Sequence, residues 1–195
     1  MSLDDLIDED LVKMAKEGSI SAFETIVNRY QKPLFNFILR MINDRHTAED
    51  ILQESFIKLM KNLPNYKPVN FKSYIFKITN NLIYDTLRKK NIEVSIYDKI
   101  DPEEENSPSI EEILYNVKEK NPDEIVEINF TREQLESAIA LLPYPQRQVF
   151  VLHEYSGLSF KEISKMLNCS INTVLARMSY AVKKLRKILK EKTEK

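Results

Sequence analysis

Residues 157–185 read GLSFKEISKMLNCSINTVLARMSYAVKKL, and this stretch carries the sharpest structural signal in the chain. SFKE at 159–162 has the form of a capping box, in which the serine accepts from the third helical amide and the glutamate reaches back. We predict a short helix that ends near Leu167, a turn over residues 168–170, and a longer helix from Ile171. This order of helix, three-residue turn and helix is typical of a helix-turn-helix.

The longer helix has an apolar side and a polar side. Its apolar positions recur at helical spacing and are expected to be buried: Val174, Met178, Ala181, Leu185 and Leu189. A helix that reads DNA needs short or hydrogen-bonding side chains near its N-terminus and basic side chains beside them. The other side supplies these in Ser170, Asn172, Thr173, Ala176, Arg177, Tyr180 and Lys184. A helix-turn-helix used only for packing is the alternative, and the combined pattern favours DNA binding.

Residues 58–90 combine basic and aromatic side chains, with eight Lys or Arg residues against one acid. We predict a helix over 71–90 with a buried stripe of Ile75, Ile78 and Leu82. Its opposite face carries Lys77, Asn81, Tyr84 and Arg88. Basic groups hold a phosphate chain, asparagine hydrogen-bonds a base edge, and aromatic rings stack on unpaired bases. Phe71 and Phe76 are expected in the core, whereas for Tyr84 core and surface positions both stay open.

Two further helices are predicted in the first half of the chain. SAFE at 21–24 and TAED at 47–50 have the form of helix caps, the first for a helix to about Met41 and the second to about Leu63. The second helix has an expected core stripe of Leu52, Phe56, Leu59 and Leu63. Its outward face carries Asp50, Gln53, Glu54, Ile57 and Lys61. An isoleucine exposed among polar residues indicates a protein contact, although scattered surface apolar residues are common.

The composition excludes several classes of protein. With 195 residues, 43% apolar and 30% charged, the chain can form a globular fold. Its two glycines, Gly18 and Gly157, are too few for glycine-rich nucleotide loops, and one cysteine, Cys169, excludes a disulfide framework. We expect Cys169 to be a small buried residue, His46 to be solvated and His153 to be a packed core residue. We therefore expect no catalytic residues, no metal site and no cofactor, and the absence of a long apolar run predicts a cytoplasmic protein.

The net charge of −1 conceals a separation of charge along the sequence. Residues 11–91 hold 14 bases and 7 acids, and residues 170–195 hold 8 bases and 2 acids. Between them, residues 92–130 hold 3 bases and 12 acids. Two basic blocks that each coincide with a candidate binding helix favour a polyanionic partner.

The domain organisation follows from these blocks. We expect an all-α chain of two small helical domains, residues 1–91 and 121–195, joined by an acidic linker at 92–120. A short helix is predicted within the linker at 109–119. Asn121-Pro122 predicts the start of a helix that runs to about Leu142.

Three motifs resemble those of a known family. AEDILQESF at 48–56 is similar to the polymerase-binding helix of bacterial sigma factors, and FKSYIFKITNNLIYDTLR at 71–88 is similar to the adjoining promoter-melting, −10-reading segment. Residues 141–143, 157–163 and 170–185 resemble the −35-reading domain. The motifs stand in the family's order, and the two-domain layout resembles the extracytoplasmic-function (ECF) subgroup.

The resemblance implies partners and roles for each domain. Core RNA polymerase would be bound, at a coiled coil of its largest subunit, by Asp50, Gln53, Glu54 and Ile57. The melted −10 element would be contacted by Lys77, Asn80, Asn81, Tyr84, Asp85 and Arg88. The helix-turn-helix would read the −35 element in duplex promoter DNA, and the acidic linker would pass through the polymerase's RNA-exit region. Such proteins are usually held inactive by a membrane-associated anti-sigma factor.

Three positions depart from the family's pattern. Asn172 stands where glycine is usual, Leu175 where a basic residue is usual, and Tyr180 where arginine is common. These exchanges remove charge from the expected −35-reading surface.

Two hypotheses of function follow. The first is a promoter-specificity subunit of RNA polymerase, and the second is a free-standing helix-turn-helix regulator whose first domain binds a ligand or another protein. The basic and aromatic helix at 71–90 favours the first, because a regulator of duplex DNA has no use for a single-strand surface. An enzyme ranks far behind both.

Overall fold

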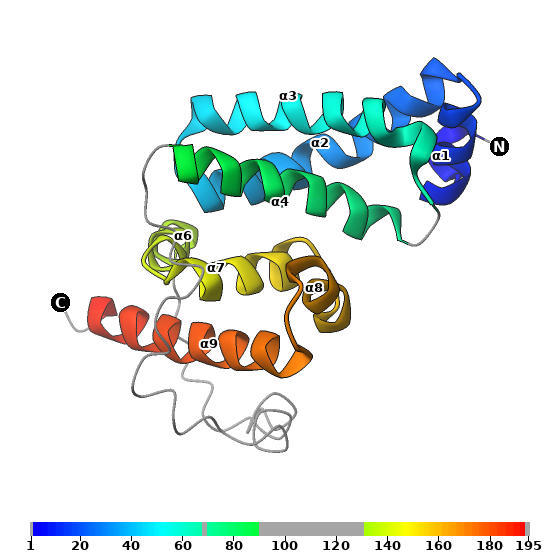
Figure 1. The fold of residues 1–195 in the computed structure, drawn as a ribbon. Coiled ribbons are helices and arrows are strands. Elements are labelled where there is room, and N and C mark those ends of the chain that lie inside the picture. The colour runs from blue at the N-terminus through cyan, green and yellow to red at the C-terminus, as the bar shows by residue number, and fades with distance from the viewer. Residues whose placement is uncertain (1, 68–69, 90–130, 194–195) are drawn as a thin grey trace. The chain divides into compact units, whose positions relative to one another are not determined.

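The computed structural model describes residues 2–67, 70–89 and 131–193, and within these ranges every regular element is helical (Figure 1). The all-α fold class predicted from the sequence is therefore confirmed. The chain divides into two compact units, residues 1–93 and 94–195. The predicted helix at 109–119 and the predicted helix start at Asn121-Pro122 lie outside the described residues.

The first unit is a bundle of helices with a short helix at one end (Figure 1). In chain order its elements are the 3-10 turn η1 (Leu3–Asp5), α1 (Asp8–Lys16), α2 (Ile20–Ile42), α3 (Arg45–Asn62), the 3-10 turn η2 (Leu63–Asn65) and α4 (Phe71–Lys89). Helices α2, α3 and α4 pack against one another, while α1 packs on α2 and also contacts η2 and α4. Helix α1 was not among the helices predicted from the sequence.

Phenylalanine side chains join α2 to α4. Phe37, Phe71 and Phe76 are at most 1% exposed, and the ring centroids of Phe37 and Phe76 lie 5.5 Å apart. The edge-to-face pair of Tyr30 and Phe71, with centroids 5.4 Å apart, makes a second link. Burial of a large apolar side chain contributes about 1.5–3 kcal/mol. The predicted core positions of Phe71 and Phe76 are confirmed.

A pair of buried hydroxyls lies between α3 and α4. Thr79 Oγ1 donates to Ser55 Oγ at 3.1 Å, and Ser55 Oγ donates to the Ile51 carbonyl at 2.7 Å. Ile51 and Ser55 therefore occupy the core side of α3, whereas Leu52 and Phe56, which were predicted there, are half-buried. Because both hydroxyls have hydrogen-bond partners, this interface accommodates polar residues that hydrophobic spacing alone cannot identify. The two later leucines of the predicted stripe are buried as expected.

Two helices begin earlier than predicted. Helix α2 is capped by Ser19 rather than Ser21, because Gly18, with φ +97°, turns the chain immediately before it. Helix α3 is capped by Asp44, which accepts from the Thr47 amide at 3.2 Å, so Thr47 lies inside the helix. In both cases a cap residue at least as good precedes the predicted one.

The second unit packs three helices around the C-terminal helix, and a helical turn connects two of them. In chain order its elements are α6 (Arg132–Ala140), α7 (Tyr144–Phe150), the π-helical turn η5 (Val151–Tyr155), α8 (Phe160–Leu167) and α9 (Ile171–Thr193). Helix α9 packs against α6, α7 and α8. The helix predicted from Asn121-Pro122 to about Leu142 ends before Pro143 as expected, but α6 begins only at Arg132, where Thr131 is an extended N-cap; α7 and η5 were not predicted. Within the described ranges no helix is long and apolar enough to cross a lipid bilayer.

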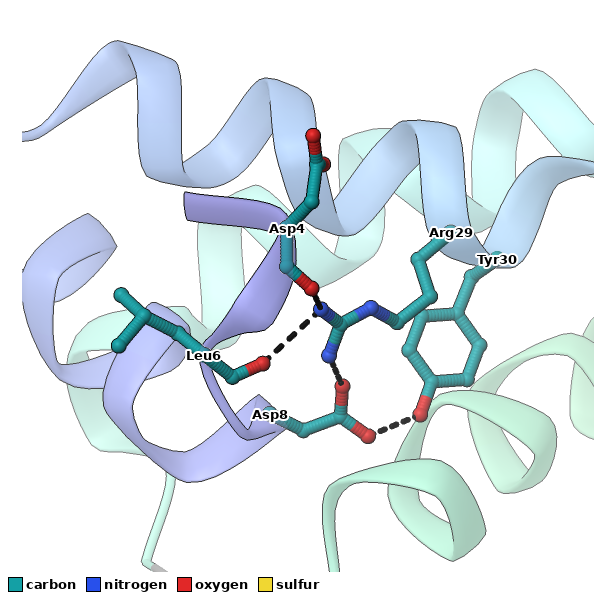
Figure 2. Close-up of polar contacts among 5 residues, drawn as sticks. All are labelled: Asp4, Leu6, Asp8, Arg29 and Tyr30. Atoms are coloured by element: carbon teal, nitrogen blue, oxygen red, sulfur yellow. Dashed lines mark hydrogen bonds and ion pairs between the residues drawn. The ribbon is translucent and has the colours of Figure 1, made fainter. Parts of the chain in front are cut away.

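A polar cluster attaches the N-terminal segment to α2 (Figure 2). Arg29 donates to the Asp8 carboxylate at 2.6 Å and to the carbonyls of Asp4 and Leu6 at 3.0 and 2.9 Å. Tyr30 donates its hydroxyl proton to the other oxygen of Asp8. Burial, together with the neighbouring Asp8 carboxylate, raises the pKa of Tyr30 far above its ordinary value, so its hydroxyl stays protonated. The Asp8 carboxylate is therefore the acceptor that ties α1 to α2.

Asp8→Asn should destabilise the first unit, because it removes the charge opposite Arg29 and one of the two acceptor oxygens. We expect the free energy of unfolding to fall by about 1–3 kcal/mol, measured by urea denaturation. Asp10→Asn is the matched control, since Asp10 is exposed in the same first turn of α1. Equal losses for the two variants would contradict the attachment through Asp8.

Candidate nucleic-acid interface

The helix-turn-helix is formed by α8, a short turn and α9, as predicted. Ser159 Oγ accepts from the Glu162 amide at 3.3 Å, and the Ser159 amide donates to the Glu162 carboxylate at 2.7 Å, which completes the capping box. Asn168 ends α8 in the left-handed conformation, with φ 53°. Ser170 then accepts from the Thr173 amide at 3.0 Å, and the two hydroxyls lie 2.9 Å apart. Local hydrogen bonds therefore fix where both helices begin.

The buried side of α9 is wider than predicted. All the side chains expected there are buried, namely Val174, Met178, Ala181, Leu185 and Leu189. Leu175 is buried as well, at 8% exposed, which corrects the expectation that it lies on the DNA-reading surface. Successive helical residues are 100° apart, so Leu175 follows Val174 onto the core side and lies one turn from Met178.

The predicted DNA-reading residues share the opposite side of α9. Ser170, Asn172 and Lys184 are exposed, and the half-buried ones are Thr173, Ala176, Arg177 and Tyr180. Cys169, in the turn, is half-buried rather than buried, and partial burial raises the pKa of its thiol. The positive charge of the Arg177 guanidinium opposes that shift.

His153 links η5 to the start of α8. Its Nδ1 lies 2.9 Å from the Leu158 carbonyl oxygen, and because a carbonyl only accepts, Nδ1 carries the proton and donates. The imidazole ring also stacks on Phe160, with centroids 4.1 Å apart. His153 packs against Phe160, but it is half-buried rather than the core residue that was predicted. The chain turns between these residues at Gly157, with φ 61°.

Helix α4 presents most of its predicted site residues on one face. Lys77, Asn81 and Arg88 are exposed, and Tyr84 and Asp85 are half-buried. Asp85 and Arg88 approach to 3.8 Å, a surface ion pair that contributes little stability. This row therefore remains available for a polyanionic partner.

Asn80 does not belong to this face. It is 8% exposed and lies on the core side of α4 beside Thr79, so the structure does not place it on the exposed face with the other residues predicted to contact DNA. A single residue step of 100° separates it from the exposed Asn81. Of the predicted buried stripe on α4, Ile75 and Leu82 are buried, whereas Ile78 is half-buried.

Tyr74 is an aromatic residue that the sequence reasoning did not select as a site residue. It lies three and seven residues before Lys77 and Asn81, so the three share one face of α4. Tyr74 is half-buried, with its ring centroid 4.7 Å from that of Tyr66, and this burial raises the pKa of its hydroxyl. Its helical spacing is the signal that could have identified it.

Helix α3 exposes the predicted protein-contact residues. Asp50, Gln53, Glu54 and Ile57 are all exposed, Ile57 at 40%. Met60, three residues after Ile57, is 55% exposed and extends the apolar part of the same surface. His46, expected to be solvated, is exposed, with Nδ1 3.3 Å from the Asp50 carboxylate.

These features define a two-unit helix-turn-helix protein, and comparisons with known proteins identify its family. Two family models match, Sigma-70 region 2 over residues 26–92 and Sigma-70, region 4 over residues 132–185. ECF RNA polymerase sigma factor SigW of Bacillus subtilis (strain 168) is 30% identical over 182 residues, which are 92% of this chain and 95% of SigW. The chain belongs to the ECF RNA polymerase sigma factors. This membership supports the first of the two hypotheses of function.

Two further comparisons agree. ECF RNA polymerase sigma factor SigE of Mycolicibacterium smegmatis is 27% identical over 173 residues, and the chain spans 63% of its length. The sigma factor RpoE, in a co-crystal structure with the anti-sigma factor NepR from Bartonella quintana, has a TM-score of 0.64 at 20% identity. That match covers 88% of this chain and 98% of the solved chain, and it supports the fold.

The burial of Leu175 makes a basic residue unfavourable at that position. Leu175→Lys should lower the free energy of unfolding by about 1–3 kcal/mol, because it replaces a packed apolar side chain by a charged one. Thermal or urea unfolding measures this loss. Asn172→Lys, at an exposed position of the same helix, should change stability by no more than about 0.5 kcal/mol. A Leu175→Lys variant as stable as Asn172→Lys would disprove this description of α9.

Proposed function

We propose that this chain binds core RNA polymerase and directs it to promoters, with α3 docking on polymerase, α4 contacting the melted −10 strand and α9 reading the −35 duplex. The observation that carries this proposal is the exposed face of α4, which sets Lys77, Asn81 and Arg88 opposite a buried side that includes Phe76. A protein that binds only duplex DNA has no need of such a second basic surface.

The face of α4 suits unpaired DNA. Lys77 and Arg88 stand at its two ends and attract phosphates, and the exposed amide of Asn81 offers a donor and an acceptor to a base edge. Tyr74 and Tyr84 are half-buried aromatic residues on the same face, and aromatic rings stack on bases without regard to sequence. We therefore propose that α4 holds the separated strand and that Asn81 supplies base recognition.

The exposed side of α9 suits the major groove of duplex DNA. The groove admits an α-helix whose first turns face the bases. Asn172, Thr173 and Arg177 lie in those turns and offer amide, hydroxyl and guanidinium groups. Lys184, two turns after Arg177, is exposed and is placed for a phosphate contact.

The exposed side of α3 suits a protein partner. Ile57 and Met60 present apolar surface, and Asp50, Gln53 and Glu54 surround it with polar and acidic groups. An apolar centre with a polar rim is the usual anatomy of an interface. We propose core RNA polymerase as the partner of this surface.

Control by an anti-sigma factor is part of the proposal. The RpoE relative is described in complex with the anti-sigma factor NepR, which supports an equivalent partner here. We propose that this partner is membrane-associated and acts on a sigma factor in the cytoplasm, where polymerase meets the chromosome. We further propose that residues 92–120 form an acidic linker between the domains 1–91 and 121–195.

Core polymerase supplied with this chain should transcribe selectively from promoters recovered out of a random-sequence library.

Glu54→Lys reverses a charge on the proposed docking face and should weaken polymerase capture on the order of tenfold, measured by fluorescence anisotropy. Glu24→Lys, the same exchange at an exposed position of α2, is the control. No transcript from any promoter would refute the function, and unchanged capture by Glu54→Lys would refute the docking face alone.

Asn80 and Asn81 provide a paired test of the single-strand surface. Asn81→Ala should reduce open-complex formation about three- to tenfold through loss of one base contact, measured by permanganate footprinting, without loss of stability. Asn80→Ala should instead lower the free energy of unfolding, because Asn80 is buried. Closed-complex binding should be unchanged in Asn81→Ala. Equal losses in closed and open complexes would eliminate the role given to Asn81.

A further inference from the structure

Helix α1 touches the connection between α3 and α4 through a lysine. Lys16, at the C-terminal end of α1, donates from Nζ to the Tyr66 carbonyl oxygen at 3.0 Å, across 50 residues of sequence. The Tyr66 amide donates to the Leu63 carbonyl at 3.1 Å, and the Tyr66 side chain is only 5% exposed. The amide and the carbonyl of Tyr66 are therefore both hydrogen-bonded, and its ring is buried. The partner of the carbonyl, Lys16, comes from a different helix.

Both ends of α1 are fixed to the same aromatic group. The Tyr66 ring packs edge-on against Phe71, with centroids 5.8 Å apart, and Phe71 packs edge-on against Tyr30 at 5.4 Å. Tyr30 donates to Asp8, which begins α1, and Lys16 ends it. A chain of contacts therefore runs from Asp8 through Tyr30, Phe71 and Tyr66 to Lys16. Because Asp8 and Lys16 are the two ends of α1, the helix connects both ends of this chain of contacts.

These contacts extend, through Tyr66, to the exposed face of α4. The Tyr66 ring lies 4.7 Å from the ring of Tyr74, which shares that face with Lys77. A displacement of the Tyr66 backbone is therefore transmitted to Tyr74 through a direct ring contact. Lys16 lies on α1, and its hydrogen bond to the Tyr66 carbonyl is the contact that connects it, through the Tyr66 ring, to Tyr74.

We propose that Lys16 is a positioning residue for the single-strand surface of α4, acting through Tyr66 and Tyr74. This inference rests on the proposed role of α4 in binding the melted strand. The hydrogen bond of Lys16 holds the backbone at Tyr66, directly after η2, and the ring of Tyr66 in turn supports the ring of Tyr74. The −10 strand then meets a surface that is already ordered, and preorganisation lowers the entropy cost of binding.

Lys16→Met tests the proposal, because it keeps the length of the side chain and removes its donor. The probe is a fluorescent single-stranded −10 oligonucleotide from a promoter recovered in the library experiment, bound to polymerase carrying the full chain. We expect Lys16→Met to weaken oligonucleotide binding about three- to tenfold and to leave polymerase affinity within about twofold. Lys13→Met, at an exposed position on the same helix, loses the same charge and should bind normally. Lys16→Arg, which restores a donor, should recover binding.

Hydrogen exchange gives a readout that does not depend on DNA. Amide exchange over residues 63–67 should be faster in Lys16→Met than in Lys13→Met, and equal rates would overturn the positioning role. Equal oligonucleotide affinities of the two variants would also overturn it, as would a loss of oligonucleotide and polymerase binding together in proportion to lost stability. Failure of the wild-type complex to bind the oligonucleotide would instead refute the proposed role of α4, and with it this inference.

Discussion

The burial of Phe71 and Phe76 against α2 determines which side of α4 faces solvent. Truncating a buried phenylalanine costs about 3–5 kcal/mol, whereas a surface ion pair such as Asp85–Arg88 contributes at most about 1 kcal/mol. The core side therefore decides the rotation of the helix, and the polar side follows from it. A rotation by one residue would expose Asn80 in place of Asn81, so the proposed single-strand surface depends directly on this packing.

The parts of the structure that could be predicted from the sequence are those determined by residues a few positions apart, such as helix caps and apolar spacing. The helix-turn-helix is encoded by two serine caps, Ser159 and Ser170, whose partners lie three residues away, and by an apolar spacing that repeats along α9. The orientation of α4 was predicted in part: Ile75 and Leu82 are buried and Lys77, Asn81 and Arg88 are exposed, as their helical spacing indicates, whereas Ile78 is half-buried and Asn80 is buried. The same holds for the exposed row on α3 that includes Glu54.

The parts that were missed depend on contacts between distant residues or on choices between equal local preferences. Nothing near Asp8 in the sequence indicates that it will pair with Arg29, 21 residues away. The packing of α1 on α2 could therefore not be predicted from local sequence. Ser19 and Ser21 are equally good helix caps, and the left-handed turn at Gly18 favours the earlier one. Leu175 could not be assigned because family patterns describe a residue type, whereas burial depends on how wide the core side of α9 is.

The burial of Leu175 also changes how the departures from the family pattern bear on promoter recognition. Of the three, only Asn172, which is exposed, and Tyr180, which is half-buried, lie on the proposed reading side of α9. The loss of positive charge on that side is therefore smaller than the sequence alone implies, and Lys184 and Lys187 remain exposed further along the helix. Phosphate contacts position a protein on DNA and base contacts specify the sequence. In the proposed assignment the departures alter which bases are read, while the affinity from phosphates is largely kept.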